Sequence, residues 1–252
     1  PTRNRATYLD FLLGEIAKFD DLNYEVVLSD NASEDDTPTV AMRWRSELKS
    51  LYYFRQSKPV TGAENAYAVC NAARGDYIFR ISDDDLVVEE GLLAALQILD
   101  RETDCAAVYP RWHICDSTLE EIRTVVHYGA DTPLIRNNTD RLEDAEPHPP
   151  IQVSLDQALE MYERFWTVEL PVFRRALFQD HIGYMSNHMP LDFYAAIKFL
   201  QHGDLYFIWD LCAKIRQHSG QDSAALYSPR VLEAYASDYE QFLSRIPGLE
   251  PA

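Results

Sequence analysis

Three consecutive carboxylates, Asp83, Asp84 and Asp85, follow the apolar run Tyr77–Ile81 and are the residues of this chain best suited to chemistry. Neighbouring negative charges repel one another, so the fold needs a reason to hold them together. A divalent cation supplies one, because Mn²⁺ and Mg²⁺ take oxygen ligands. In an extended segment Asp83 and Asp85 point to the same side, where they can share a metal. The alternative is that the triplet only places negative charge before a helix expected from Glu89, and the triplet alone leaves both open.

A second polar loop, Asp30–Thr37, follows the β-branched and aromatic run Tyr24–Ser29 in the same way. In sheets with parallel strands, ligands bind beyond the carboxyl ends of the strands. Both acidic loops fall at such ends, so the sequence predicts one ligand site that contains Asp30 and the triplet.

Strand and helix patterns alternate through roughly the first 110 residues, which is typical of βαβ units and a mainly parallel sheet. We therefore expect an α/β fold, and we interpret the chain as a single domain, with a ligand-binding half over 1–110 and a second half over 111–252. The expected helices are Ala6–Phe19, Glu64–Ala73, Glu89–Leu99, Ser154–Phe165, Leu191–Leu200 and Arg230–Leu243, and the further expected strands are Leu51–Arg55, Cys105–Trp112, Val168–Phe173 and Leu205–Trp209. Gly129–Pro150 has no clear period and reads as a long loop.

Four short motifs occur in order, and together they resemble the inverting glycosyltransferases of family 2, which have the GT-A fold. They are Pro1-Thr2-Arg3-Asn4-Arg5, Ser29-Asp30-Asn31-Ala32-Ser33, Gly62-x-x-x-Asn65, and Ala73-Arg74-Gly75-Asp76-Tyr77-Ile78 leading into the acidic triplet. The resemblance covers about the first 90 residues. It implies a Rossmann-like central sheet flanked by helices and the transfer of a sugar from a nucleotide diphosphate donor, most simply a UDP-sugar, to a hydroxyl of a glycan or glycolipid.

The resemblance also implies the residues of the donor site. Asp30 would accept a hydrogen bond from the donor base, Asn65 would position the nucleotide, and a Mn²⁺ or Mg²⁺ ion would bind the diphosphate. The residues expected to bind the nucleotide sugar are Pro1, Thr2, Arg3, Arg5, Asp30, Asn31, Asn65, Arg74, Asp83 and Asp84. The expected metal ligands are Asp83, Asp85 and His218, the last from a segment, Arg216-Gln217-His218, that is similar to an R-x-H segment of the family.

An inverting transfer needs a base that deprotonates the acceptor hydroxyl. The family keeps this carboxylate at the start of a helix in its second half, which here corresponds to Asp192 in Met189-Pro190-Leu191-Asp192. The resemblance favours Asp192 as the base, and Asp180 is a weaker candidate. Read from the sequence alone, Asp192 is equally well explained as an acid that favours the helix dipole.

Two departures from the family pattern affect these expectations. The family places an apolar strand immediately before its P-T-x-N-R motif, so we expect residues upstream of Pro1 to supply a central strand. Ser82 stands where many members carry the first acid of D-x-D. The departure at Ser82 leaves the choice of metal ligands among Asp83, Asp84 and Asp85 open.

The composition limits the partners. The chain of 252 residues has 41 Asp and Glu against 23 Lys and Arg, a net charge of −18, which argues against a nucleic-acid binder. A phosphate ligand would then need a cation as intermediary. No apolar run is long enough to span a membrane, and peripheral association with one remains compatible with the sequence. Cys70, Cys105, Cys115 and Cys212 form no C-x-x-C pair, which favours free thiols and a cytoplasmic protein.

Two other classes of protein stay open. A nucleotidyltransferase acting on sugar phosphates also combines an α/β fold with metal-binding acids, although Pro1–Arg5 lacks the glycines such enzymes use to hold a triphosphate. A non-catalytic protein could use the same acidic loops to bind a metal or a partner. The leading interpretation is a metal-dependent transferase of polysaccharide biosynthesis.

Overall fold

The structure of the protein, a computed structural model, describes residues 1–125, 149–154, 171–182 and 191–218. Within these ranges, the side chains of residues 123–125, 181–182, 191–194 and 197 are not described. The helices expected over Ser154–Phe165 and Arg230–Leu243, and most of the irregular Gly129–Pro150 stretch, therefore lie outside the described residues.

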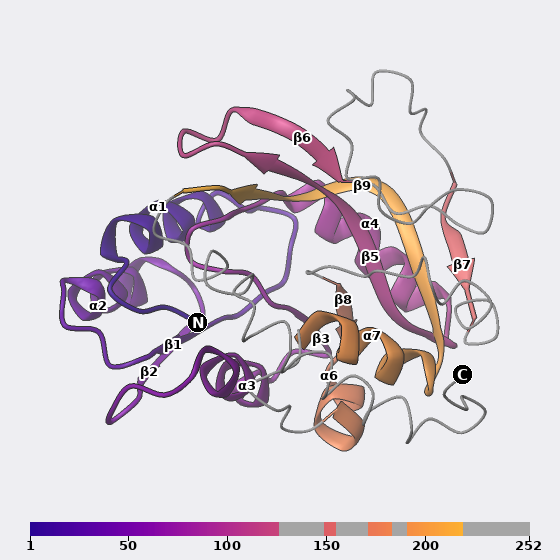
Figure 1. Cartoon of the computed structure of the whole chain (residues 1–252), viewed down its shortest axis with the longest axis horizontal. Helices are drawn as coiled ribbons and strands as arrows, with labels where there is room; N and C mark the ends of the chain where they lie inside the picture. Colours follow the sequence, from indigo (N-terminus) through magenta and orange to yellow (C-terminus); the bar gives the residue numbers. More distant parts are fainter. Residues whose placement is uncertain (126–148, 155–170, 183–190, 219–252) are drawn as a thin grey trace, which may run out of the picture.

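The first part of the chain alternates helices and strands as the sequence predicts (Figure 1). The expected helix at Glu64 begins two residues earlier, because Thr61 caps it: Thr61 Oγ1 accepts from the Glu64 amide, and the Glu64 carboxylate accepts from the Thr61 amide. The elements are α1 (Ala6–Ile16), β1 (Val26–Asp30), α2 (Thr37–Glu47), β2 (Leu51–Arg55), α3 (Gly62–Ala72), β3 (Tyr77–Phe79), β4 (Leu86–Val87) and α4 (Glu89–Arg101).

The second part is built around two long strands, β5 (Cys105–Cys115) and β9 (Asp204–Arg216), which run parallel to each other. Both continue beyond their expected ends. Between them in the chain lie β6 (Glu121–Val125), β7 (Ile151–Val153), β8 (Val172–Arg174), α6 (Arg175–Leu177), the π-helical turn η1 (Phe178–Ile182) and α7 (Leu191–Leu200).

The described strands form two sheets rather than one mainly parallel sheet. β1 and β2 pair in parallel, and the larger sheet has the order β3-β8-β5-β9-β4, with β6 on β5 and β7 on β9. Within the larger sheet only β5 and β9 are parallel, and its other described pairs are antiparallel. The sheet is therefore more mixed than predicted, because β6, β7 and β8 come from the irregular second half, where the sequence shows no βαβ pattern.

Helices cover both faces of β5 and β9 (Figure 1). Side chains alternate along a strand, except at an irregularity of β5 between Cys105 and Ala107. Cys105, Val108, Tyr206 and Ile208 pack against α4, while Ala107, Tyr109, Leu205 and Phe207 pack on the face covered by α7. Helix α4 crosses β9 closely at Gly91, where an added Cβ would lie 2.1 Å from the Leu211 carbonyl oxygen. Glycine is therefore required there for steric reasons.

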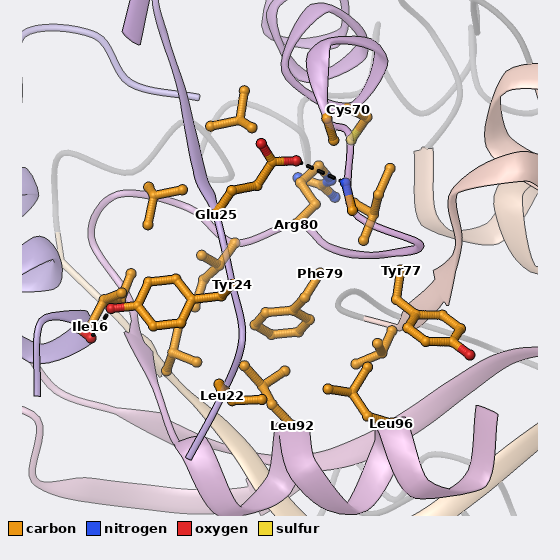
Figure 2. A pocket seen from close by; sticks show the side chains of 18 of the residues that line it. Ile16, Leu22, Tyr24, Glu25, Cys70, Tyr77, Phe79, Arg80, Leu92 and Leu96 are labelled. Atoms are coloured by element: carbon orange, nitrogen blue, oxygen red, sulfur yellow. Dashed lines mark hydrogen bonds between the residues drawn. The ribbon is translucent and has the colours of Figure 1, made fainter. Parts of the chain in front are cut away.

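A cavity of about 390 Å³ separates β1 from β3 (Figure 2). Its wall is mainly apolar, with Tyr24, Phe79, Leu92 and Leu96 around it and Arg80 among the few charged groups. Pro1 belongs to the lining, whereas the acidic triplet does not. The cavity thus lies between β1 and β3, and it is separate from the acidic triplet.

Candidate active site

The acidic triplet lies in the turn between β3 and β4 and is buried. Asp83, Asp84 and Asp85 are only 3–4% exposed, and the Asp85 amide donates to the Ser82 carbonyl oxygen at 3.3 Å. Strand β3 ends at Phe79, so the triplet is not extended. The extended segment assumed in pairing Asp83 with Asp85 is therefore absent, because the three acids lie in a turn.

Asp83 and Asp84, rather than Asp83 and Asp85, share a cation. Arg5 Nη1 donates to Asp83 Oδ1 at 3.0 Å and to Asp84 Oδ2 at 2.7 Å. Thr2 Oγ1 donates to the other oxygen of Asp83 at 2.5 Å. Burial raises the pKa of Asp83, and the Thr2 hydrogen bond and the Arg5 charge oppose that shift. The first motif of the chain thus binds the acidic triplet directly.

The end of β9 closes the site from the other side. The Arg216 backbone N–H donates to Asp85 Oδ1 at 2.9 Å, and its Nε donates to the Asp84 carbonyl oxygen at 2.8 Å. His218 Nε2 lies 2.9 Å from Asp84 Oδ2, and the His218 ring stacks on Tyr8 with centroids 4.8 Å apart. His218 therefore lies against Asp84 of the triplet, its expected role as a metal ligand stays a prediction, and Arg216 fixes the backbone of the triplet.

Asp30 lies beside the same motif, but its carboxylate faces protein groups. A parallel bridge joins Thr2 to Asp30. Asp30 Oδ1 accepts from the Ser33 amide at 2.8 Å and Oδ2 from the Tyr53 hydroxyl at 2.9 Å, with Arg55 Nε 3.5 Å away. Asp30 is fully buried, so a nucleotide base would have to displace one of these partners to reach it.

The two expected asparagines are also used within the fold. The Asn31 side chain exchanges hydrogen bonds with the backbone of Val60, at 2.8 and 2.7 Å. Asn65 Oδ1 accepts from the Ser29 hydroxyl at 2.6 Å, and its amide donates to the Ser29 carbonyl oxygen at 3.2 Å. Both therefore shape the carboxyl end of β1.

The structure does not bring Arg74 to the site. Its backbone N–H binds Glu25, which directly precedes β1, and its guanidinium lies over Tyr52 near the start of β2. These contacts lie at the amino ends of β1 and β2, whereas Asp30 lies at the carboxyl end of β1. This geometry gives no support to Arg74 as a nucleotide ligand. Arg3 is exposed in the N-terminal loop.

The expected base is placed only by its backbone. Asp192 is the second residue of α7, as the helix-start prediction requires, and its side chain lies outside the described atoms. The weaker candidate, Asp180, is exposed in η1.

Among the described side chains, no three His, Cys, Asp or Glu residues converge on a point that could hold a metal. The donor set still fits a hard cation. Two buried carboxylates already lie within 3.0 Å of one cationic nitrogen, Arg5 Nη1, and oxygen ligands of this kind suit Mn²⁺ or Mg²⁺. Asp83, Asp84 and His218 are thus the groups that could hold a cation, and Asp85 is directed to the Arg216 amide.

Several residues of the site escaped sequence reasoning. Asn4 adopts a positive φ of 51°, accepts from the Glu34 amide at 2.7 Å and donates from its own amide to Ser33 Oγ at 2.9 Å. It thereby joins the first two motifs. Its place in Pro1–Arg5 was a usable signal, as was the place of Arg216 in the R-x-H segment. No sequence signal marked Tyr8, Tyr53 or Arg55.

Comparison with solved structures supports the fold. The chain aligns over its whole length with 66% of Staphylococcus aureus TarS residues 1–349, solved in complex with UDP-GlcNAc, at a TM-score of 0.68 and 17% identity. Over 96% of its length it aligns with 62% of the mannosyltransferase PcManGT from Pyrobaculum calidifontis, solved with GDP-Man and Mn²⁺, at a TM-score of 0.61 and 17% identity. The GT-A fold expected from the sequence is confirmed.

Sequence comparison identifies the family. The abequosyltransferase RfbV of Salmonella typhimurium is 33% identical over 127 residues, which are 49% of this chain and 37% of RfbV. The uncharacterized protein Mb1547 of Mycobacterium bovis is 25% identical over 222 residues, 86% of this chain and 57% of that protein. The chain thus spans between about a third and three fifths of these relatives. The family model for glycosyl transferase family 2 matches residues 1–157, and the chain belongs to that family.

Proposed function

We propose that the protein transfers a sugar from a nucleoside diphosphate donor, most simply a UDP-sugar, to a hydroxyl of a glycan or glycolipid, with a divalent cation. The observation that carries this proposal is the Arg5 bridge: two buried carboxylates at the carboxyl end of β3 are held around one positive nitrogen. A site of this kind favours a cation, and in a chain of net charge −18 a cation is the simplest means of holding a diphosphate.

Asp83, Asp84 and His218 would hold the cation, which when bound stabilises the negative charge of the departing diphosphate. Thr2 and Arg5 orient Asp83, since both donate to its carboxylate. Arg216 keeps the Asp84 carbonyl group and the Asp85 carboxylate in place. These residues would bind the cation and orient the carboxylates around it before any bond of the donor is broken.

The donor base has candidate partners at the carboxyl ends of β1 and β2. Arg55 is 47% exposed, whereas Asp30 behind it is buried and joined to Tyr53. Arg55 is therefore the group of this pair that a base would meet first, and Asp30 would act by holding Arg55 and Tyr53. Asp192 at the start of α7 would take the proton from the acceptor hydroxyl, a role typically worth about 10²–10⁴ in rate.

The relatives support the choice of reaction and leave the donor open. TarS was solved with UDP-GlcNAc and PcManGT with GDP-Man and Mn²⁺, and the name of RfbV describes an abequosyltransferase. No helix within the described ranges has the length and apolarity that a membrane crossing requires. We place the activity in polysaccharide biosynthesis at the cytoplasmic side of a membrane, where glycolipid acceptors are available.

The test is release of nucleoside diphosphate from a panel of UDP-, GDP- and dTDP-sugars, with Mn²⁺ and with a chelator. We expect release of the nucleoside diphosphate from one of these donors, and only in the presence of Mn²⁺. Parallel reactions with nucleoside triphosphates and sugar 1-phosphates detect the alternative nucleotidyltransferase by release of pyrophosphate. Pyrophosphate release without sugar transfer contradicts the proposal.

A further inference from the structure

A cationic patch, formed by Arg111, His113 and Lys214, lies on the paired strands β5 and β9 outside the acidic site. His113 and Lys214 are direct partners in the parallel register, and Arg111 precedes His113 by two residues. The register of β5 and β9 shifts on both sides of Arg111. Arg111 and His113 alternate with Trp112 and Ile114, and Lys214 alternates with Ala213 and Ile215, so the three side chains of the patch share the face away from the apolar cluster of those neighbours. Trp112 and Ile114 take the opposite face, where they pack with Phe79 and Ile81.

Arg111 is held in place by an aromatic ring rather than by an ion pair with a described residue. Its guanidinium lies 4.8 Å over the Trp209 ring, and its Nε is buried with no hydrogen-bond partner among the described residues. A buried donor left unpaired costs roughly 1–3 kcal/mol. Asp210 and Glu121 are the acidic groups near enough to influence Arg111, but neither forms an ion pair with it within the described part of the chain. The strand therefore presents a cation that has acidic neighbours but no ion pair among the described residues.

His113 is oriented by a neighbour and keeps one nitrogen unused. Its Nδ1 lies 2.9 Å from Glu121 Oε2, and its Nε2 is buried with no partner among the described atoms. Burial lowers the pKa of His113, Glu121 opposes that shift, and Arg111 and Lys214 add to it. With the proton on Nδ1 facing Glu121, Nε2 of the neutral ring is a hydrogen-bond acceptor.

The patch lies close to the acidic site and on the side of α7. Cys115, two residues after His113, pairs with Arg216, which binds Asp84 and Asp85. Two strand residues span about 7 Å. Tyr109, two residues before Arg111, packs in one cluster with Ala196 and Phe199 of α7. The patch is thus placed between the acidic site and the helix that begins with the expected base.

We propose that Arg111 and Lys214 bind a phosphate group of the acceptor, and that His113 accepts a hydrogen bond from a hydroxyl of the acceptor beside that phosphate. This inference rests on the proposed transferase function and specifies its acceptor. Two cations without described ion-pair partners match the double charge of a phosphate better than the single charge of a carboxylate.

The experiment measures binding of inorganic phosphate, with acetate as the singly charged comparison, in the presence of a chelator by isothermal titration calorimetry. Arg111→Gln and Lys214→Gln each remove one cation, and Arg101→Gln removes an exposed cation of α4 as the control. Phosphate should bind the wild type in preference to acetate. Its affinity should fall at least tenfold in the first two variants and stay within twofold in the control. Circular dichroism verifies folding, and Lys214→Gln keeps the test valid if Arg111→Gln does not fold.

UDP binding in the presence of Mn²⁺ separates the possible failures. It should stay within twofold of wild type in both patch variants, because the patch lies outside the donor site. If UDP affinity falls as far as phosphate affinity, the patch serves the donor and the inference is wrong. Unchanged phosphate affinity in both variants, or equal binding of acetate, also overturns it. If phosphate binds through the patch while the wild type binds no UDP, the anion site stands and the proposed transferase function falls.

Discussion

Thr2 donates a hydrogen bond from its hydroxyl to Asp83 Oδ2 at 2.5 Å, across 81 positions of the chain. Both side chains are almost fully buried. This contact joins the loop before α1 to the acidic turn after β3, so the geometry of the candidate cation site depends on the N-terminal motif.

Thr2→Val should therefore lower the free energy of unfolding by about 1–3 kcal/mol, because it keeps the shape of the side chain and leaves a buried carboxylate oxygen unpaired. Urea denaturation measures the change. Thr7→Val, at an exposed position of α1, is the matched control and should change stability by less than about 0.5 kcal/mol. Equal stabilities for the two variants would show that the Thr2–Asp83 contact contributes nothing.

Arg5→Gln removes the cation shared by Asp83 and Asp84. In metal-free buffer we expect a loss of about 3 kcal/mol, since breaking a buried pair leaves charges uncompensated. Mn²⁺ should raise the melting temperature of this variant more than that of the wild type, because a bound ion stabilises the native state and takes over the position of the guanidinium. Arg101→Gln, which breaks an exposed ion pair with Glu102, serves as the control. A Mn²⁺ response no larger than that of the wild type would argue against a cation site at this position.

Tyr53 should make stability depend on pH at the alkaline end. Burial and the hydrogen bond to Asp30 raise the pKa of Tyr53 to about 12, from an unfolded value of about 10. The folded state thus keeps a proton that the unfolded state loses, so this contribution is complete below about pH 10 and is lost as the pH rises towards about 12. Tyr53→Phe removes it.

Urea midpoints of wild type, Tyr53→Phe and the neighbouring exposed-residue variant Tyr52→Phe, followed upward from about pH 8, test this expectation. The stability advantage of the wild type over Tyr53→Phe should shrink above about pH 10, whereas its difference from Tyr52→Phe should not follow that course. A constant advantage of the wild type over Tyr53→Phe would refute the assignment.

Asp192→Asn should reduce turnover about 10²–10⁴-fold while leaving donor affinity unchanged, as expected for loss of a general base. Steady-state rates and donor titrations on the same preparations measure the two effects. Asp180→Asn tests the weaker candidate and should retain turnover. If Asp180→Asn is the inactive variant, the base belongs to η1 and not to α7.

The sequence predicts the local features of this protein well. The motifs at Pro1–Arg5, Ser29–Ser33 and Asp83–Asp85 do meet, because the first motif contacts both of the others through Thr2 and Asn4. The sequence does not predict features that depend on residues far apart in the chain. Nothing in the triplet shows that Arg216, 131 positions away from Asp85, binds it, or that β3 ends at Phe79 and leaves the acids in a turn.

Some polar residues of the family motifs, which we expected to bind the nucleotide sugar, form hydrogen bonds with other protein groups instead. Asn31 and Asn65 are both committed to backbone or hydroxyl partners, and Asp30 is enclosed by Ser33, Tyr53 and Arg55. A motif records which residue types occur, whereas burial determines which of them can meet a ligand. Arg74 shows the same limit, since it lies beside Glu25 and Tyr52 at the amino ends of β1 and β2, whereas the end of its motif leads into the site.

The most direct test of the central claim is calorimetric titration of the full chain with UDP, with Mn²⁺ and with a chelator, in wild type and in Asp83→Asn. Mn²⁺ should raise the affinity of the wild type for UDP at least tenfold. Asp83→Asn should remain folded and show no such increase in UDP affinity with Mn²⁺. Metal-independent binding of UDP by the wild type, or an unchanged Mn²⁺ effect in Asp83→Asn, would contradict the central claim.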